Sequence, residues 1–242
     1  MDDNQTDQSV SVVTVTKLRH WPRLVVVSVG SALLWLIEFW YQYYVYIPGD
    51  FGSAWVRSNS LTGATLLSLA LLLSALFKWR PRLAGHYRWR RNLGVAGFAF
   101  ISLHILGVLQ YYVGWNVFSL FYTWQPFENP MVFGLAAYVI VLGMAITSTE
   151  WMVRKLKQWW KFIHRFIYLA EVGIIFHALL LGGPVLKTPP GYVLYAVGGA
   201  AIVGQVYWWG RVSKLRQFKN VGFLIGLGLI VLVLALSYVA YR

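Results

Sequence analysis

The sequence predicts an all-α membrane protein, a polytopic bundle of about seven transmembrane helices, and three observations support this fold class. The 242 residues are 58% hydrophobic and only 12% charged, whereas a soluble domain carries about twice that charged fraction. Seven apolar stretches each approach the roughly 20 residues that cross about 30 Å of hydrocarbon. Lys and Arg gather between these stretches. Because an open chain satisfies its backbone in lipid only as a helix, each stretch is expected to be helical.

The polar residues 1–16 lack the basic start and the cleavage site of a signal peptide, and we expect them to form a disordered cytoplasmic tail. Aromatic side chains cluster at the ends of the first and sixth spans, as is typical of the interface between lipid and water. The seven predicted spans, of which the second is the shortest, are Leu24–Tyr44, Leu61–Phe77, Leu93–Val113, Met131–Thr149, Phe162–Leu181, Gly191–Trp209 and Val221–Tyr241.

The distribution of Lys and Arg predicts the orientation of the chain. If the N-terminus is cytoplasmic, 18 of the 21 basic residues lie on that side, and only Arg57, Lys187 and Arg242 lie on the other. Short cytoplasmic loops carry an excess of Lys and Arg, so this bias favours a cytoplasmic N-terminus. The net charge of +13 is therefore attributed to topology and lipid headgroup contact rather than to nucleic acid.

The chain contains no cysteine. This excludes disulfides, cysteine-ligated iron–sulfur clusters, thiolate zinc sites and covalent attachment of haem through C-x-x-C-H. No glycine-rich nucleotide fingerprint follows a predicted strand. Any haem is therefore expected to be bound without a covalent link.

Two histidines inside the predicted spans are the main candidates for a functional site. Ionisable groups within membrane spans are rare and usually mark a ligand or a transfer path. His104 lies roughly 18 Å into the third span, and His177 lies roughly 21 Å into the fifth, counted from the cytoplasmic edge at about 1.5 Å per residue. Two imidazoles at one depth predict the axial ligands of a buried haem iron.

The residues beside these histidines allow two interpretations. Small residues share each helical face: Gly97 and Gly107 with His104, and Ala170 and Gly173 with His177. A flat macrocycle needs such small neighbours, but small residues at these spacings also serve ordinary helix packing in lipid. A structural histidine pair without a ligand is the alternative.

His164 lies near the cytoplasmic rim and is a candidate ligand of a second haem. Its 13-residue separation from His177 leaves the two side chains about 140° apart on an ideal helix. Either the span begins irregularly near His164, or the residue faces a different neighbour. His86 is the nearby candidate partner, and contact with lipid headgroups is the alternative. Glu38 and Glu171 also lie within spans. Glu171 shares a helical face with His164, seven residues away, and two interpretations stay open: it gates a proton or contacts a quinone, or it pairs with a neighbouring hydroxyl or cation.

Two motifs resemble a known family. Arg90-Arg91-Asn92-Leu93-Gly94 precedes the span of His104, and a Trp-x₃-His-x₃-Tyr pattern at residues 160–168 precedes His177. Over roughly residues 60–210 the chain resembles the ferric-reductase-like transmembrane domain. It is most similar there to the haem-binding membrane subunit of the bacterial protein-methionine-sulfoxide reductase system. The N-terminal extension and the first span, rich in Trp and Tyr, depart from the family pattern.

The resemblance implies more than the spacing does. His104, His164 and His177 match the three histidine positions of the family, whose members bind b-type haem, with one or two haems expected here. It implies a bacterial inner-membrane location, electron donation by quinone or a cytoplasmic flavin reductase, and a periplasmic molybdoenzyme as acceptor. FMN is expected from the resemblance alone. The implied domains are an extra transmembrane helix at 17–58, the haem-binding domain at 59–210 and a C-terminal transmembrane helix at 211–242.

The sequence therefore predicts an electron-transfer subunit of an oxidoreductase that relays single electrons from the inner to the outer face. A stand-alone ferric or cupric reductase is the alternative within redox chemistry. A non-haem transporter or assembly subunit is the alternative from another class, although paired broken helices and internal symmetry are not apparent.

Overall fold

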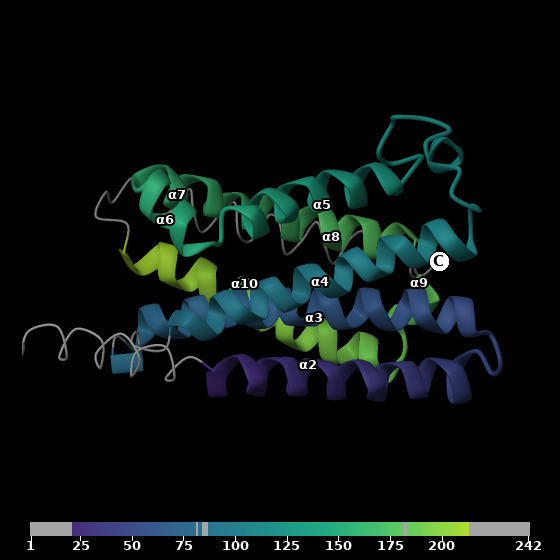
Figure 1. Ribbon diagram of the computed structural model, residues 1–242, viewed down its shortest axis with the longest axis horizontal. Coiled ribbons are helices and arrows are strands. Elements are labelled where there is room, and N and C mark those ends of the chain that lie inside the picture. Colours follow the sequence, from purple (N-terminus) through teal and green to yellow (C-terminus); the bar gives the residue numbers. More distant parts are fainter. Residues whose placement is uncertain (1–20, 81, 84–86, 182, 213–242) are drawn as a thin grey trace, which may run out of the picture.

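A computed structural model of the chain describes residues 21–80, 82–83, 87–181 and 183–212, and every regular element within these ranges is a helix. The long helices run side by side along one axis (Figure 1). Four helical stretches are long and apolar enough to cross a membrane, and a bent pair makes a fifth if it counts as one span. For the described residues, the all-α class is confirmed.

The first two long helices form a hairpin. Helix α2, Trp21–Trp40, continues as a π-helical segment η1, Tyr41–Tyr46, and α3 spans Phe51–Trp79. The Asp50 carboxylate accepts a hydrogen bond from the Ser53 amide at 2.9 Å and so caps α3. Because this hydrogen bond stabilises the charged form, it lowers the pKa of Asp50.

Helix α4, Tyr87–Tyr111, packs closely along α3. A Cβ added at Gly63 would lie 2.8 Å from the Ile101 side chain, and one at Gly107 would lie 2.7 Å from Trp55 Cδ1. Such contacts leave room only for glycine, which lets the two helix backbones approach each other.

The chain then leaves the bundle and returns. Residues 112–130 form an extended connection that includes a short 3-10 helix, η3, Val117–Leu120. Helix α5, Met131–Ile146, follows, and the chain bends by 94° into α6, Glu150–Leu156. The Thr149 hydroxyl accepts a hydrogen bond from the Met152 amide and caps α6. The fourth span was predicted to end at Thr149, whereas α5 ends three residues earlier, at Ile146.

The fifth predicted span is one helical stretch with an interruption. Helix α7, Gln158–Ile163, passes through a 3-10 turn, η4, His164–Phe166, into α8, Ile167–Leu181. Of the two alternatives that the phase of His164 left open, the irregular start of the span is therefore present. Two further helices follow, α9, Gly183–Leu186, and α10, Pro189–Val212.

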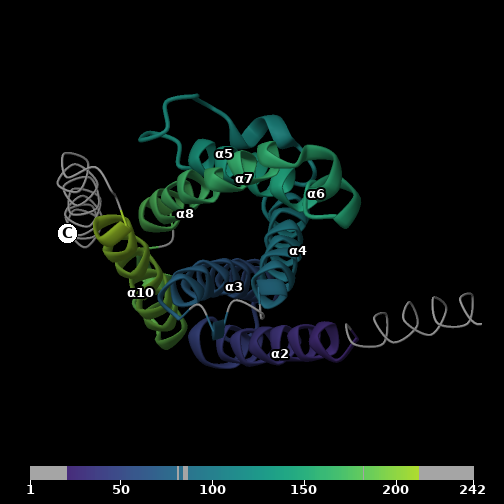
Figure 2. The ribbon, with the colours of Figure 1, turned by 90° about the vertical axis from the view of Figure 1, so that its left-hand side faces the viewer.

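Viewed along the bundle, α5, α7 and α8 lie on one side, α3 and α10 on the other, and α4 closes one edge (Figure 2). Helix α2 lies outside α3 in the same view. A buried cluster of Leu67, Ala137, Val141 and Ala170 joins α3, α5 and α8. Phe98 and Ile101 of α4, the helix that carries His104, pack against this cluster.

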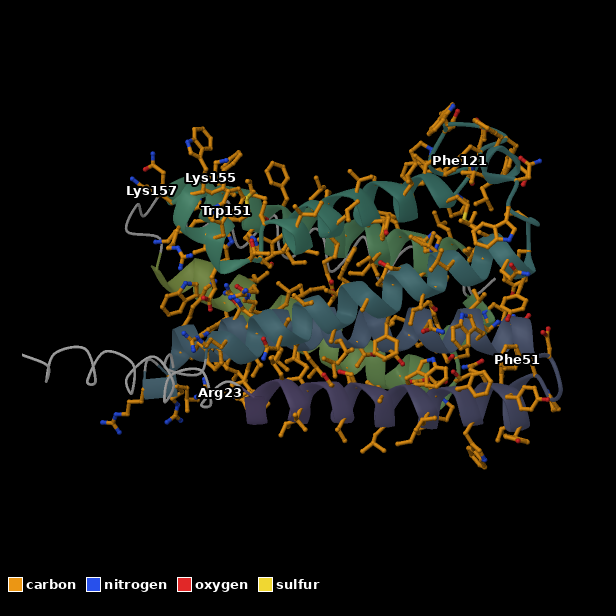
Figure 3. The ribbon with its side chains drawn as sticks, viewed as in Figure 1. Arg23, Phe51, Phe121, Trp151, Lys155 and Lys157 are labelled. Carbon is orange, nitrogen blue, oxygen red and sulfur yellow. The ribbon has the colours of Figure 1, made fainter. Side chains whose placement is uncertain are left out.

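The two ends of the bundle differ in charge. Arg23, Trp151, Lys155 and Lys157 lie at one end, and Phe51 and Phe121 lie toward the other (Figure 3). We call the first the basic end, defined by Arg23, Lys155 and Lys157 together with Lys78, Arg88, Arg90 and Arg91, which lie where α3 ends and α4 begins.

Many apolar side chains point outward, with Leu24, Leu33 and Ile37 of α2 about half exposed or more, as expected of a lipid-facing helix.

The predicted spans agree with the helices in position but not always in extent. The second span was predicted to begin at Leu61, whereas α3 begins ten residues earlier at Phe51. Residues 57–60 are polar, so hydropathy did not predict that the helix includes them. Arg57, which was predicted to lie in a loop, therefore lies within α3. Helix α10 covers the sixth span but is not among the four helices above, and 221–241 lies outside the described residues. The count of seven stays a prediction.

Candidate functional site

The structure brings His104 and His177 together. His104 lies on α4, which closes one edge of the bundle, and His177 lies on α8. Their ring centres are 6.4 Å apart and the ring planes make an angle of 74°. The sequence placed the two residues at one depth, and the structure adds that the rings face each other across the bundle rather than turning toward lipid.

A backbone carbonyl fixes the orientation of each ring. His104 Nδ1 donates to the carbonyl oxygen of Val56 on α3, and His177 Nδ1 donates to that of Pro130, just before α5, both at 3.0 Å. Because a carbonyl oxygen only accepts, Nδ1 must carry the proton on both rings. The lone pair of each Nε2 is therefore free, and no described residue forms a hydrogen bond with it. Metal-binding histidines are commonly held by such a backbone carbonyl.

The spacing of the pair fits one shared metal ion. A metal ion lies about 2 Å from each imidazole nitrogen that binds it, which puts the centres of two such rings about 6 Å apart. The observed 6.4 Å agrees with that value. Among the described residues no three His, Cys, Asp or Glu side chains group as a metal site. Two imidazoles suffice for haem, because the porphyrin supplies the remaining ligands of the iron.

Gly134 on α5 makes room for the His177 ring. A Cβ at this position would lie 2.8 Å from His177 Nδ1, 3.0 Å from Cε1 and 3.2 Å from Cγ. Glycine thus allows the ring to lie directly against α5, within reach of the Pro130 carbonyl. Sequence reasoning did not identify Gly134, since nothing local distinguishes it from other glycines of the span.

The small residues that were predicted beside the histidines contact neighbouring helices instead. Gly97 and Gly107 face side chains of α3, and Gly173 faces the Phe133 carbonyl and Ala137 of α5. Ala170 is fully buried in the core cluster. These contacts favour the helix-packing interpretation of the small residues over the macrocycle interpretation.

His164 has a different environment from the pair. Its Nε2 lies 3.2 Å from Thr147 Oγ1, and its ring stacks on Trp160 with ring centres 4.1 Å apart. The Thr147 hydroxyl donates to the Gly143 carbonyl at 2.8 Å, so His164 Nε2 is the donor to Thr147. The free lone pair of His164 is therefore on Nδ1. His86, its predicted partner, lies outside the described residues.

Both carboxylates predicted inside spans are buried. Glu38 on α2 is 4% exposed and Glu171 on α8 is 6% exposed. Neither contacts the histidine pair through a hydrogen bond. Sequence reasoning missed Ser68 of α3, whose hydroxyl donates to Glu171 Oε1 at 2.8 Å. A serine within an apolar run was the available signal.

Comparison with known proteins gives concordant results. Residues 59–175 match the family model described as ferric reductase like transmembrane component. The protein-methionine-sulfoxide reductase heme-binding subunit MsrQ of Klebsiella pneumoniae subsp. pneumoniae is 30% identical over 188 residues, which cover 77% of this chain and 87% of that relative. The proteins of the same name from Enterobacter sp. and Caulobacter vibrioides are 27% and 29% identical, over 80% and 63% of this chain and 93% and 70% of their own lengths.

Proposed function

The chain belongs to the ferric-reductase-like transmembrane family, and from this premise we propose that it is a membrane haem protein that relays single electrons. His104 and His177 are proposed as the two axial ligands of one b-type haem. Haem iron, when bound, supplies one-electron chemistry at a potential that the surrounding protein tunes. The relatives above are named as heme-binding subunits of a reductase, which supports this assignment.

The facing imidazole pair is the observation that carries the proposal. The Val56 and Pro130 carbonyls hold both rings in the tautomer that presents Nε2 to a metal. Each ligand comes from a different helix, so the cofactor would also bridge α4 and α8. The helices around the pair are apolar, and an apolar environment would favour the less charged form of a bound iron.

The direction of transfer is proposed from the charge of the two ends. With the basic end in the cytoplasm, as 18 of 21 basic residues favour, electrons enter from quinone or a cytoplasmic flavin reductase. They leave at the outer face of the bacterial inner membrane to a periplasmic reductase of the methionine-sulfoxide type, with a molybdoenzyme as the proposed acceptor. His164 at the basic end is proposed as a ligand of a second haem or of FMN. The domain boundaries 17–58, 59–210 and 211–242 are proposed as given above.

A spectrum of the purified protein tests the proposal. We expect b-type bands in the reduced-minus-oxidised difference spectrum, and we expect His104→Ala and His177→Ala each to abolish bound haem without preventing membrane insertion. His164→Ala should retain the haem of the pair, because His164 lies outside it. Absence of b-type bands in the wild type, or full haem retention in both single variants, overturns the assignment.

A further inference from the structure

A second set of buried polar side chains lies between the histidine pair and the basic end, where it has no role in haem ligation. Its inner member is Glu171, whose Oε1 accepts from the Ser68 hydroxyl and whose Oε2 has no hydrogen-bond partner. The backbone of Gly198 on α10 faces the same carboxylate, since a Cβ there would lie 3.9 Å from Oε1. A buried carboxyl group in a membrane span is costly and usually functional.

A separate group of hydrogen bonds lies between this carboxylate and the basic end. Tyr168 lies one turn before Glu171 on α8, and its hydroxyl donates to Gln205 Oε1 on α10 at 3.2 Å. Lys78 Nζ donates to the same oxygen at 2.9 Å, and the Gln205 amide donates to the Leu71 carbonyl at 3.0 Å. The polar groups of three helices thus meet at Gln205.

A fourth helix, α4, adds a hydrogen bond to this group of polar side chains near the basic end. Arg90 of α4 donates to the Ser74 hydroxyl at 3.2 Å. On α3 the residues Ser68, Leu71, Ser74 and Lys78 follow one another at helical spacing, so a polar group recurs on nearly every turn. We call this set, with Tyr168, Glu171 and Gln205, the polar track. It leads from water at the basic end to the middle of the bundle.

The burial of the polar track favours a proton over a larger ligand. Ser68 is 1% exposed, Gln205 3% and Glu171 6%, so the inner part of the track is closed to lipid tails and to a ring the size of a quinone. No ion pair to Glu171 occurs among the described residues. The titratable or charged side chains on the surrounding elements include Lys78 on α3, Arg90 on α4, Tyr168 on α8 and Tyr195 on α10. A proton can move along hydroxyl, amide and carboxyl groups with bridging water.

Glu171 is also close enough to sense the charge of the haem. It precedes His177 by six residues on one helix, about 9 Å along the axis. Charges separated by such a distance inside an apolar bundle are weakly screened. An electron added near His177 therefore favours the neutral form of the carboxyl group.

We propose that Glu171 takes up one proton from the basic end, through the polar track, when the haem held by His104 and His177 is reduced. One electron, from a quinol or a reduced flavin, converts ferric to ferrous iron, and one proton converts the Glu171 carboxylate to a carboxylic acid. The net charge inside the bundle is then unchanged by reduction. Oxidation of the haem returns the proton. This inference rests on the proposed function.

The pH dependence of the haem midpoint potential tests the inference. Coupling of one proton to one electron changes the reduction equilibrium tenfold per pH unit, about 59 mV. We expect the wild-type midpoint potential to fall as pH rises through the range in which Glu171 titrates, with a slope that approaches this value. Glu171→Gln should abolish the pH dependence of the potential while retaining haem. Glu38→Gln is the matched control, since Glu38 is an equally buried membrane carboxylate outside the polar track, and it should keep the wild-type slope.

Three results overturn the inference: a flat wild-type potential, a slope that survives Glu171→Gln, or a slope that Glu38→Gln abolishes equally. If Glu171→Gln does not assemble, Ser68→Ala replaces it. That change removes one hydrogen-bond donor to the carboxylate, so the sloping region should move to higher pH, and an unmoved region counts against the inference. Gln205→Leu should retain the slope and slow reduction by interrupting the track. Protein without haem refutes the proposed function instead, so the two failures are distinguishable.

Discussion

Gly134→Ala probes the histidine pair without removing a ligand. The added Cβ would lie 2.8 Å from His177 Nδ1, whereas atoms in favourable contact lie about 3.5 Å apart or more. The ring must therefore move away by about 0.7 Å. Its hydrogen bond to the Pro130 carbonyl, now 3.0 Å, would then approach the length at which it no longer counts as one.

The expected loss can be worked out from that hydrogen bond. A typical net value is about 1 kcal/mol, which corresponds to about a fivefold weaker haem affinity. Gly143→Ala on the same helix is the matched control, because no atom lies within 4 Å of the Cβ that it adds. Both substitutions raise the intrinsic helix propensity of α5 by up to about 1 kcal/mol, so reduced stability of the helix does not explain a difference between them.

Titration of the haem-free protein with haem, followed in the Soret band, measures the effect. Gly134→Ala should bind haem at least about fivefold more weakly than Gly143→Ala. Equal affinities, with both variants folded and inserted, would refute the reasoning that α5 positions the His177 ring.

Three further changes have defined outcomes. Asp50→Ala should cost about 1 kcal/mol of stability by removing the cap of α3, measured by thermal unfolding against Asp50→Asn, which keeps a capping side chain. Because the folded-state pKa of Asp50 is lowered, its contribution is present above the ordinary range of an aspartate and is lost as pH falls through the folded value, so the wild type and Asp50→Ala should converge in acid. His164→Ala should slow electron input or remove part of the haem, and an unchanged spectrum and rate would assign His164 to a structural or headgroup contact. Gly107→Ala should destabilise the fold, because its Cβ would overlap Trp55, and unfolding at the wild-type temperature would contradict this.

The sequence predicted the helical class and the depth of the pair because both depend on local pattern. Apolar length places a span, and a rise of about 1.5 Å per residue places His104 and His177 within their spans. The phase of His164 left two alternatives, an irregular start of the span or a different neighbour, and the 3-10 turn at His164–Phe166 corresponds to the first.

The sequence could not predict features that depend on contacts between distant segments. The first ten residues of α3 carry polar side chains that hydropathy assigns to a loop, yet Ser58 and Asn59 are fully buried against other helices. The sequence could not identify the Val56 and Pro130 carbonyls as hydrogen-bond acceptors of the two histidines, because every residue has a backbone carbonyl. The meeting of Lys78, Tyr168 and Gln205 likewise follows from the packing of α3, α8 and α10.

Electron paramagnetic resonance of the oxidised, purified protein tests the central claim most directly. Two imidazoles on one iron predict a low-spin, six-coordinate haem in the wild type, and replacement of either His104 or His177 by alanine should remove that signal. A high-spin, five-coordinate wild-type haem, or a low-spin signal that is undiminished in either variant, would contradict the account.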